Sequence, residues 1–292
     1  DLAGTFEGIG AEIGKKNDVI TIVAPLADMP AEKAGLKSGD KIYAIDGKTT
    51  AGLEVDEAVS KIRGPKNTTV TLTISRDGFA KPQDFKIVRQ AIIVKSVRKL
   101  LRDDKIFVIT ITNFNNDTTE LFKQAAQEAV EKNPKGIILD LRNNPGGYLE
   151  TAVDVASEWI DQGVIVSEQF NTEKKNDYLR RGRARLKDFP TVVLVNQGSA
   201  SASEIVSGAL KDYGKATIVG MKTFGKGSVQ TLDELNDGSS VKITVAKWLT
   251  PKGNNINEQG ITPDVEVDLT SEDYDKGRDP QLDKAVELLN KK

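Results

Sequence analysis

The stretch TVVLVNQGSASASEIVSGAL, residues 191–210, decides the fold of the larger part of this chain. It begins with an apolar run, residues 191–195, continues through Gly and Ser residues typical of a turn, and ends with a helical pattern over residues 202–210. A strand, a turn and a helix in this order form a unit of an α/β protein. We therefore expect Ser201 near a helix N-terminus, where free N–H groups and the helix dipole favour negative charge.

The same alternation extends outward from this stretch after about residue 95. Apolar runs predict strands over residues 105–112 and 136–141, and helical periodicity predicts helices over residues 118–132 and 148–160. The polar and basic interval 169–188 is too long for a simple connection. We interpret it as a solvated surface loop or as a lid that contacts substrate.

The first ninety or so residues have a different rhythm, in which short strands are separated by turns marked with glycine. The expected strands are residues 18–23, 41–46, 69–75 and 84–88, and the expected helices are residues 30–36 and 55–62. This pattern indicates a small α+β module. With 292 residues the chain is longer than a typical single core, so we expect two domains, residues 1–92 and 93–292, and an α/β class overall.

Composition excludes several functions. The 41 basic and 43 acidic residues nearly cancel, so charge gives no case for a nucleic acid as partner. Without Cys or His, the chain has no thiolate nucleophile, no Ser-His-Asp triad and no Cys or His ligands for a metal. We expect no metal or organic cofactor, and a proton must be moved by Lys, Asp, Glu, Tyr or a terminal amine.

Three serines, Ser199, Ser201 and Ser203, lie in the turn and at the start of the expected helix. Taken alone, they fit a serine-rich turn with a serine N-cap as well as they fit a nucleophile. A lysine occurs further on, in the segment TFGKGSVQ, residues 223–230. Lys226 and Gln230 are four residues apart and would share one face of an extended strand, although a surface hairpin would also accommodate them.

A lysine acts as general base only when it is neutral, so its pKa must fall from about 10.4 toward 7 or 8. Such a shift corresponds to roughly 4 kcal/mol and requires a packed site. Serine–lysine dyads are a known variant of the serine triad, with the lysine serving as the base. A third segment, LDLRNNPGG at residues 139–147, ends in two glycines. Either Gly146 or Gly147 would complete an oxyanion hole with the N–H of Ala202, if the segment is more than a tight turn.

In combination, these segments closely resemble the C-terminal processing peptidases, also called tail-specific proteases. Lys226 follows Ser201 by 25 residues, Gln230 follows Lys226 by four, and GNNINEQGITPDV at residues 253–265 is a further signature. The resemblance implies that Ser201 is the nucleophile, Lys226 the general base and Gln230 the residue that orients the lysine. It also implies a crotonase-like or Clp-like α/β peptidase core.

The N-terminal module is similar to the PDZ domain of that family. The resemblance rests on FEGIGA at residues 6–11, AEKAGLKSGD at residues 31–40 and IDG at residues 45–47. A glycine-bearing loop presents N–H groups to a C-terminal carboxylate, and an exposed strand edge accepts the peptide as an added strand. The peptide-binding residues that this implies, with Ile9 nearest the carboxylate, are Gly8, Ile9, Gly10 and Ala11.

The resemblance as a whole implies a serine endopeptidase that captures protein C-termini, with those termini as substrates and activators. The alternative is a non-catalytic scaffold in which the PDZ-like groove alone functions. The chain contains no apolar run near the roughly 20 residues that span a bilayer, and it begins with Asp1 rather than Met. We therefore expect an upstream leader or membrane anchor to have been removed. The resemblance to the family implies an extracytoplasmic location of bacterial type and association of copies into a homo-oligomer.

Overall fold

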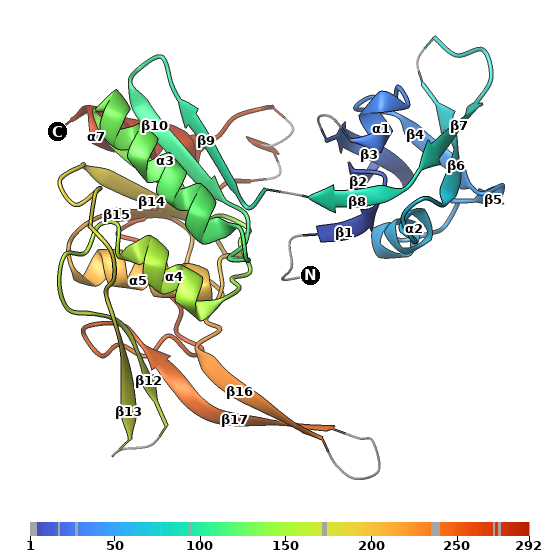
Figure 1. Cartoon of the computed structure of the whole chain (residues 1–292). Coiled ribbons are helices and arrows are strands. Elements are labelled where there is room, and N and C mark those ends of the chain that lie inside the picture. Colours follow the sequence, from blue (N-terminus) through green and yellow to red (C-terminus); the bar gives the residue numbers. More distant parts are fainter. Residues whose placement is uncertain are drawn as a thin grey trace. The chain divides into compact units, whose positions relative to one another are not determined.

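The computed structural model describes residues 5–16, 18–26, 29–76, 78–93, 95–170, 174–234, 240–270, 272–273 and 276–291. They belong to two compact units, Ala3–Val94 and Lys95–Lys292 (Figure 1). The division falls close to the domain boundary expected between residues 92 and 93. In the part of the chain that the structure describes, no helix combines the length and apolar character needed to cross a membrane.

The N-terminal unit is built on an antiparallel sheet with strand order β2-β3-β4-β6-β7, and β5 pairs with β4 at one side. A separate pair of strands, β1 and β8, also belongs to this unit. The bounds are β1 Thr5–Gly8, β2 Ala11–Lys16, β3 Val19–Pro25, α1 Pro30–Lys33, β4 Lys41–Ile45, β5 Lys48–Thr49, α2 Val55–Ile62, β6 Thr69–Ser75, β7 Gln83–Val88 and β8 Gln90–Ile93.

Strand β6 shows why this sheet has one dry face. Its sequence TVTLTIS alternates, and Val70, Leu72 and Ile74 are fully buried. These three side chains share a core with Ala58 and Ile62 of α2. The expected helix and strand positions are therefore largely correct here, although α1 ends at Lys33, before the residue 36 expected, and Gly35 has a positive φ.

The C-terminal unit is centred on a sheet with order β18-β15-β14-β11-β10-β9, in which only β9 runs antiparallel to its neighbour. A helix lies between β10 and β11, between β11 and β14 and between β14 and β15, as expected for an α/β fold. The bounds are β9 Val97–Leu101, β10 Ile106–Ile111, α3 Thr118–Lys132, β11 Gly136–Asp140, α4 Leu149–Ala156, β14 Thr191–Val195, α5 Ala202–Asp212, β15 Thr217–Gly220, β18 Val265–Glu266 and α7 Pro280–Asn290.

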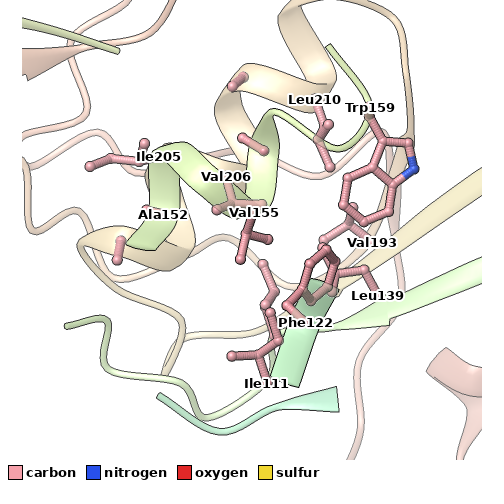
Figure 2. Packing of buried hydrophobic residues seen from close by; sticks show 14 of the residues in the cluster. Ile111, Phe122, Leu139, Ala152, Val155, Trp159, Val193, Ile205, Val206 and Leu210 are labelled. Atoms are coloured by element: carbon pink, nitrogen blue, oxygen red, sulfur yellow. The ribbon is translucent and has the colours of Figure 1, made fainter. Parts of the chain in front are cut away.

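The central strands β11, GIILD, and β14, TVVLV, are buried on both faces, so they are almost wholly apolar. Val193 and Val195 face the larger cluster, which also contains apolar residues of α3, α4 and α5. Their neighbours Val192 and Leu194 face the opposite way and pack with Leu289 of α7. Figure 2 shows the larger cluster, in which Phe122, Val155, Trp159, Val193 and Val206 meet.

A second sheet, order β13-β12-β17-β16, extends the unit. Its strands are β12 Val164–Gln169, β13 Lys175–Leu179, β16 Ser228–Glu234 and β17 Ser240–Leu249, and β16 and β17 form a long hairpin (Figure 1). The interpretation of residues 169–188 as a loop is therefore wrong for β13, which pairs antiparallel with β12. The helix expected over residues 148–160 is also too long, since α4 ends at Ala156.

Candidate active site

Ser201 is at the junction between the turn after β14 and the first residue of α5. It is the N-cap of α5 and has φ 54° and ψ −113°. A residue other than glycine rarely has a positive φ, and such strain costs about 1–3 kcal/mol, which the surroundings must support. Ser201 is one of nine described non-glycine residues with a positive φ, and its ψ of −113° also lies outside the left-handed helical region. Because strained residues cluster at functional sites, this conformation supports Ser201 as a functional residue.

The three serines of this segment have different surroundings. Ser199 is fully buried and its hydroxyl donates to the carbonyl of Leu141 at 2.8 Å. Ser203 is fully buried and donates to the carbonyl of Asn144 at 2.9 Å. Ser201 is half-buried. Of the three, only Ser201 therefore has a hydroxyl that a substrate can reach, and the other two fasten the turn to the strand end beside it.

That strand end is the glycine loop, residues 141–147, which follows β11. The side chain of Asn144 donates to the carbonyl of Ile111 and accepts from the N–H of Gly146, and the Asn144 carbonyl accepts from the N–H of Ala200. Gly146 has φ 102°, and a Cβ there would lie 2.7 Å from the Cβ of Ser201. Only glycine fits at this position, so the loop lies directly against the candidate nucleophile.

The neighbouring glycine is equally constrained. Gly147 has φ 145°, and a Cβ there would lie 1.9 Å from the carbonyl oxygen of Phe114. Among the described residues, no acceptor is found for the N–H of Gly147 or for the N–H of Ala202. The N–H of Gly146, by contrast, is bound to Asn144 at 2.9 Å.

Lys226 belongs to the lysine loop, residues 221–227, which precedes β16. A buried carboxylate, Glu204 in the first turn of α5, binds this loop and the serine turn together. Its Oε1 accepts from the Thr223 hydroxyl and the Gly225 N–H, both at 2.6 Å. Its Oε2 accepts from the N–H of Ser201 at 2.8 Å and the N–H of Lys226 at 2.9 Å. The backbone N–H groups of the two candidate catalytic residues thus donate to the same carboxylate oxygen.

Sequence reasoning missed Glu204. A signal was present, because Ser201 and Glu204 have the Ser-x-x-Glu spacing of a capping box. The spacing indicates a helix start, however, and does not reveal that the same carboxylate also binds a loop some twenty residues further along the chain.

The side chains of Ser201 and Lys226 are not joined. Lys226 is exposed, so the packed surroundings expected for a lysine base are not found in the described structure. No hydrogen bond between its Nζ and the Ser201 hydroxyl occurs there either. Catalytic hydrogen bonds are often long or absent before substrate binds. Gln230 is in β16, but its side chain lies outside the described residues, so its role stays a prediction. In the same described part, no group of acidic side chains is arranged to hold a metal ion.

In the N-terminal unit, the four expected peptide-binding residues form the connection from β1 to β2. The side chain of Ile9 is 2% exposed and belongs to the core, so only its backbone can face a ligand. The carbonyls of Ile9 and Gly10 accept from Ala31 and Leu26, whereas among the described residues their N–H groups have no acceptor. Strand β2 follows at the edge of the sheet, next to α2.

Comparison with known proteins matches residues 105–267 to the sequence model of peptidase family S41, and residues 3–75 to that of the PDZ domain. The S41 match includes the glycine loop, Ser201, Glu204 and Lys226. The chain belongs to peptidase family S41. Its N-terminal unit is a PDZ domain, and the overall class is α/β, as expected from the sequence.

Relatives within the S41 family include a probable CtpA-like serine protease of Staphylococcus aureus, 48% identical over 273 residues. A protein of the same description from Staphylococcus epidermidis is 44% identical over 268 residues. Each alignment covers 91% of this chain but 54% of the relative, so the chain spans about half the length of either. Among solved structures, the photosystem II D1 C-terminal processing protease is similar with TM-score 0.59 and 33% identity, covering 91% of this chain and 73% of that one.

Proposed function

We propose that this chain is a serine endopeptidase that recognises protein C-terminal tails through its PDZ domain and cleaves peptide bonds with Ser201 and Lys226. The observation that carries the proposal is the shared carboxylate. Glu204 binds the backbone of an accessible, strained serine and the backbone of a lysine. A merely structural serine turn would not need a lysine loop fastened to it through a buried charge.

The reaction that this arrangement supports has two halves. The neutral amine of Lys226 takes the proton of the Ser201 hydroxyl as Oγ bonds to the substrate carbonyl carbon. The same proton passes to the leaving amine as the C–N bond breaks, which leaves an ester on Ser201. The C-terminal tail leaves with this amine. Lys226 then takes a proton from water as the water oxygen attacks the ester carbonyl, and the proton returns to Ser201 Oγ as the C–O bond breaks and the N-terminal fragment is released with a new carboxyl group. We assign to Gln230 the orientation of Lys226.

The negative charge on the tetrahedral intermediate needs hydrogen-bond donors. The N–H groups of Gly147 and Ala202 support this role, because both lack an acceptor among the described residues and both belong to the segments around Ser201. The N–H of Gly146 is already bound to Asn144, so we assign Gly146 the role of allowing the close approach to Ser201.

Tail recognition is proposed for the connection between β1 and β2. Free N–H groups at Ile9 and Gly10 suit a carboxylate, and the peptide would extend the sheet along β2 beside α2. Gly8 and Ala11 flank these groups at the strand ends. For the full-length protein, we further propose an extracytoplasmic location, a membrane anchor and association of copies, each on the family resemblance alone.

The decisive experiment compares cleavage of an unstructured protein by this chain and by its Ser201→Ala variant, using mass spectrometry. Each is offered the substrate with a free C-terminal carboxylate and with a C-terminal amide. We expect cleavage only by the chain with Ser201 and faster cleavage of the free carboxylate. Binding of the free tail without any Ser201-dependent cleavage would favour the non-catalytic scaffold instead.

A further inference from the structure

We propose that Phe224 contacts the substrate and creates a preference for an uncharged apolar side chain beside the scissile bond. The inference rests on the peptidase function proposed above and adds a specificity-determining residue to it.

Phe224 is unusually exposed for its size. At 68% it is the most exposed large hydrophobic residue in the described part of the chain, followed by Leu100 at 62%. A single exposed apolar side chain is common on protein surfaces and needs no function. The case for Phe224 therefore depends on how its backbone is held and on what surrounds it.

The backbone of the lysine loop is fixed on both sides of Phe224. The N–H of Thr223 donates to the carbonyl of Ile261, and the carbonyl of Gly225 accepts from the N–H of Glu258 at 2.8 Å. Gly225 has φ 88°, and a Cβ there would lie 3.1 Å from the backbone of Glu258. Since Glu204 also binds this loop, a swing of the whole segment that would bury the ring is prevented.

The Phe224 N–H donates to the carbonyl of Ser199 at 3.0 Å, which fastens the residue directly to the serine turn. The residue that accepts this hydrogen bond, Ser199, comes two residues before Ser201 in the chain. Phe224 itself comes two residues before Lys226. Thr223 and Gly225 are buried, whereas Phe224 and Lys226 are exposed. The aromatic ring and the Lys226 side chain therefore leave the loop on its solvent side, and a peptide that binds the half-buried Ser201 also approaches from solvent.

The chemistry of Phe224 and Lys226 determines which substrate side chain is favoured beside them. An aromatic face attracts hydrocarbon side chains, and it also attracts cations. Lys226 becomes positively charged as it takes the Ser201 proton, and a cationic substrate side chain nearby would oppose that charge, so neutral apolar side chains are favoured over Lys or Arg. A substrate side chain seated on Phe224 also excludes water from beside Lys226, which strengthens electrostatic interactions there.

The test uses peptides with a free C-terminus and one cleavage site. Each position from three before to three after the scissile bond is occupied in turn by Leu or by Ser, and kcat/KM is measured for each pair. We expect a Leu/Ser ratio of about 10 or more at one position at least, the usual size for an apolar subsite. Phe224→Ala should reduce that ratio to about 3 or less while the Ser peptides are cleaved at nearly the original rate. Phe224→Leu should retain most of it.

Leu100→Ala is the matched control, because it removes a similarly exposed apolar side chain from β9 of the same unit and should leave the ratio unchanged. An unchanged ratio in Phe224→Ala, or an equal loss on Leu and Ser peptides, overturns the inference while the peptidase function stands. Binding of the same peptides to the Ser201→Ala background provides a readout without catalysis. If the Leu preference in Kd survives Phe224→Ala there, the contact is absent whether or not the chain is a peptidase.

Discussion

At the scale of single residues, the candidate site depends on a small number of individual hydrogen bonds. Ser199, Ser201 and Ser203 are chemically identical, yet two hydroxyls are consumed by carbonyls of the glycine loop and one is accessible. Composition alone removes His and Cys from the candidate mechanism. The choice among the three serines came from family resemblance at the sequence level, and burial now supports the same residue. Glu204 could not be recognised in this way, because its partners Thr223 and Gly225 are adjacent to it only in the folded chain.

The Glu204→Gln substitution tests this carboxylate. An amide nitrogen replaces one of two oxygens that each accept two hydrogen bonds, so buried N–H or O–H donors lose their acceptor. We expect kcat/KM to fall about 100-fold and the free energy of unfolding to fall by about 1–3 kcal/mol, the usual cost of unsatisfied buried groups. Peptide cleavage and denaturant unfolding measure the two effects.

Substitutions at Thr223 test whether the hydrogen bond to Glu204 positions the site for catalysis. Thr223→Ser keeps the hydroxyl that donates to Glu204 at 2.6 Å and should retain most of the peptidase activity. Thr223→Val removes this hydroxyl and should lose most of the activity. Ser207→Ala is the control, because that buried hydroxyl of α5 donates within its own helix.

For the Glu204→Gln variant, activity within threefold of the original would contradict the role proposed for the carboxylate.

At the scale of elements, helices and strands with a long amphipathic or wholly apolar sequence were predicted, whereas a short strand of exposed polar residues was not. Helix α3 and strands β11 and β14 were expected within a residue or so of their bounds, because long amphipathic or wholly apolar segments have few alternatives. Strand β13, KNDYL, was expected as loop, since exposed polar residues form a strand only when a neighbour such as β12 supplies the hydrogen bonds. The C-terminal helix α7 was not predicted either, although Asp279 and Pro280 form a clear helix start.

An ion pair fastens α7 to the glycine loop. Arg142 binds Asp140 at 2.7 Å and Asp279, the N-cap of α7, at 2.9 Å. Burial alone would raise the pKa of the Asp279 carboxyl, but hydrogen bonds from Arg142 and the Leu282 N–H outweigh it, and the pKa lies below its ordinary value. A lowered pKa in the folded state stabilises the protein above the ordinary carboxyl pKa of about 4, and this contribution is lost as the pH falls through the lowered value.

We therefore expect Asp279→Asn, which keeps a good N-cap but removes the charge, to lower the free energy of unfolding by about 1 kcal/mol at pH 7. The difference from the original chain should shrink as the pH falls below about 4, because the carboxyl is then being protonated. Denaturant unfolding at a series of pH values measures it. Two curves that stay parallel from pH 7 to pH 2 would show that the ion pair contributes nothing.

At the scale of the whole molecule, two separate cores correspond to two proposed tasks. The core of the PDZ domain and the clusters of the S41 unit share no residue. Recognition of a tail and cleavage of a peptide bond can therefore be altered independently, and binding in one unit can regulate the other only by shifting a conformational equilibrium.

We expect a second, uncleavable peptide with a free C-terminus to increase turnover of a short substrate severalfold, and its amidated form to have little effect. Gly10→Ala should abolish this stimulation but not basal turnover, because a Cβ at Gly10, φ 70°, would lie 2.5 Å from the Cβ of Met29. Gly52→Ala is the control, since Gly52 has φ 80° with open space around it. Turnover that does not respond to the free tail would remove activation from the proposal and leave recruitment.

The sequence by itself determined the class of the fold, the division into two parts and the limits on the chemistry. Apolar periodicity and the absence of His and Cys are properties of the chain that need no neighbours. Only the tertiary structure decided which serine is accessible, that Glu204 joins the serine turn to the lysine loop, and that Phe224 is held out in solvent. These features arise from hydrogen bonds and burial between segments far apart in the chain, and no local pattern encodes which donor will meet which acceptor.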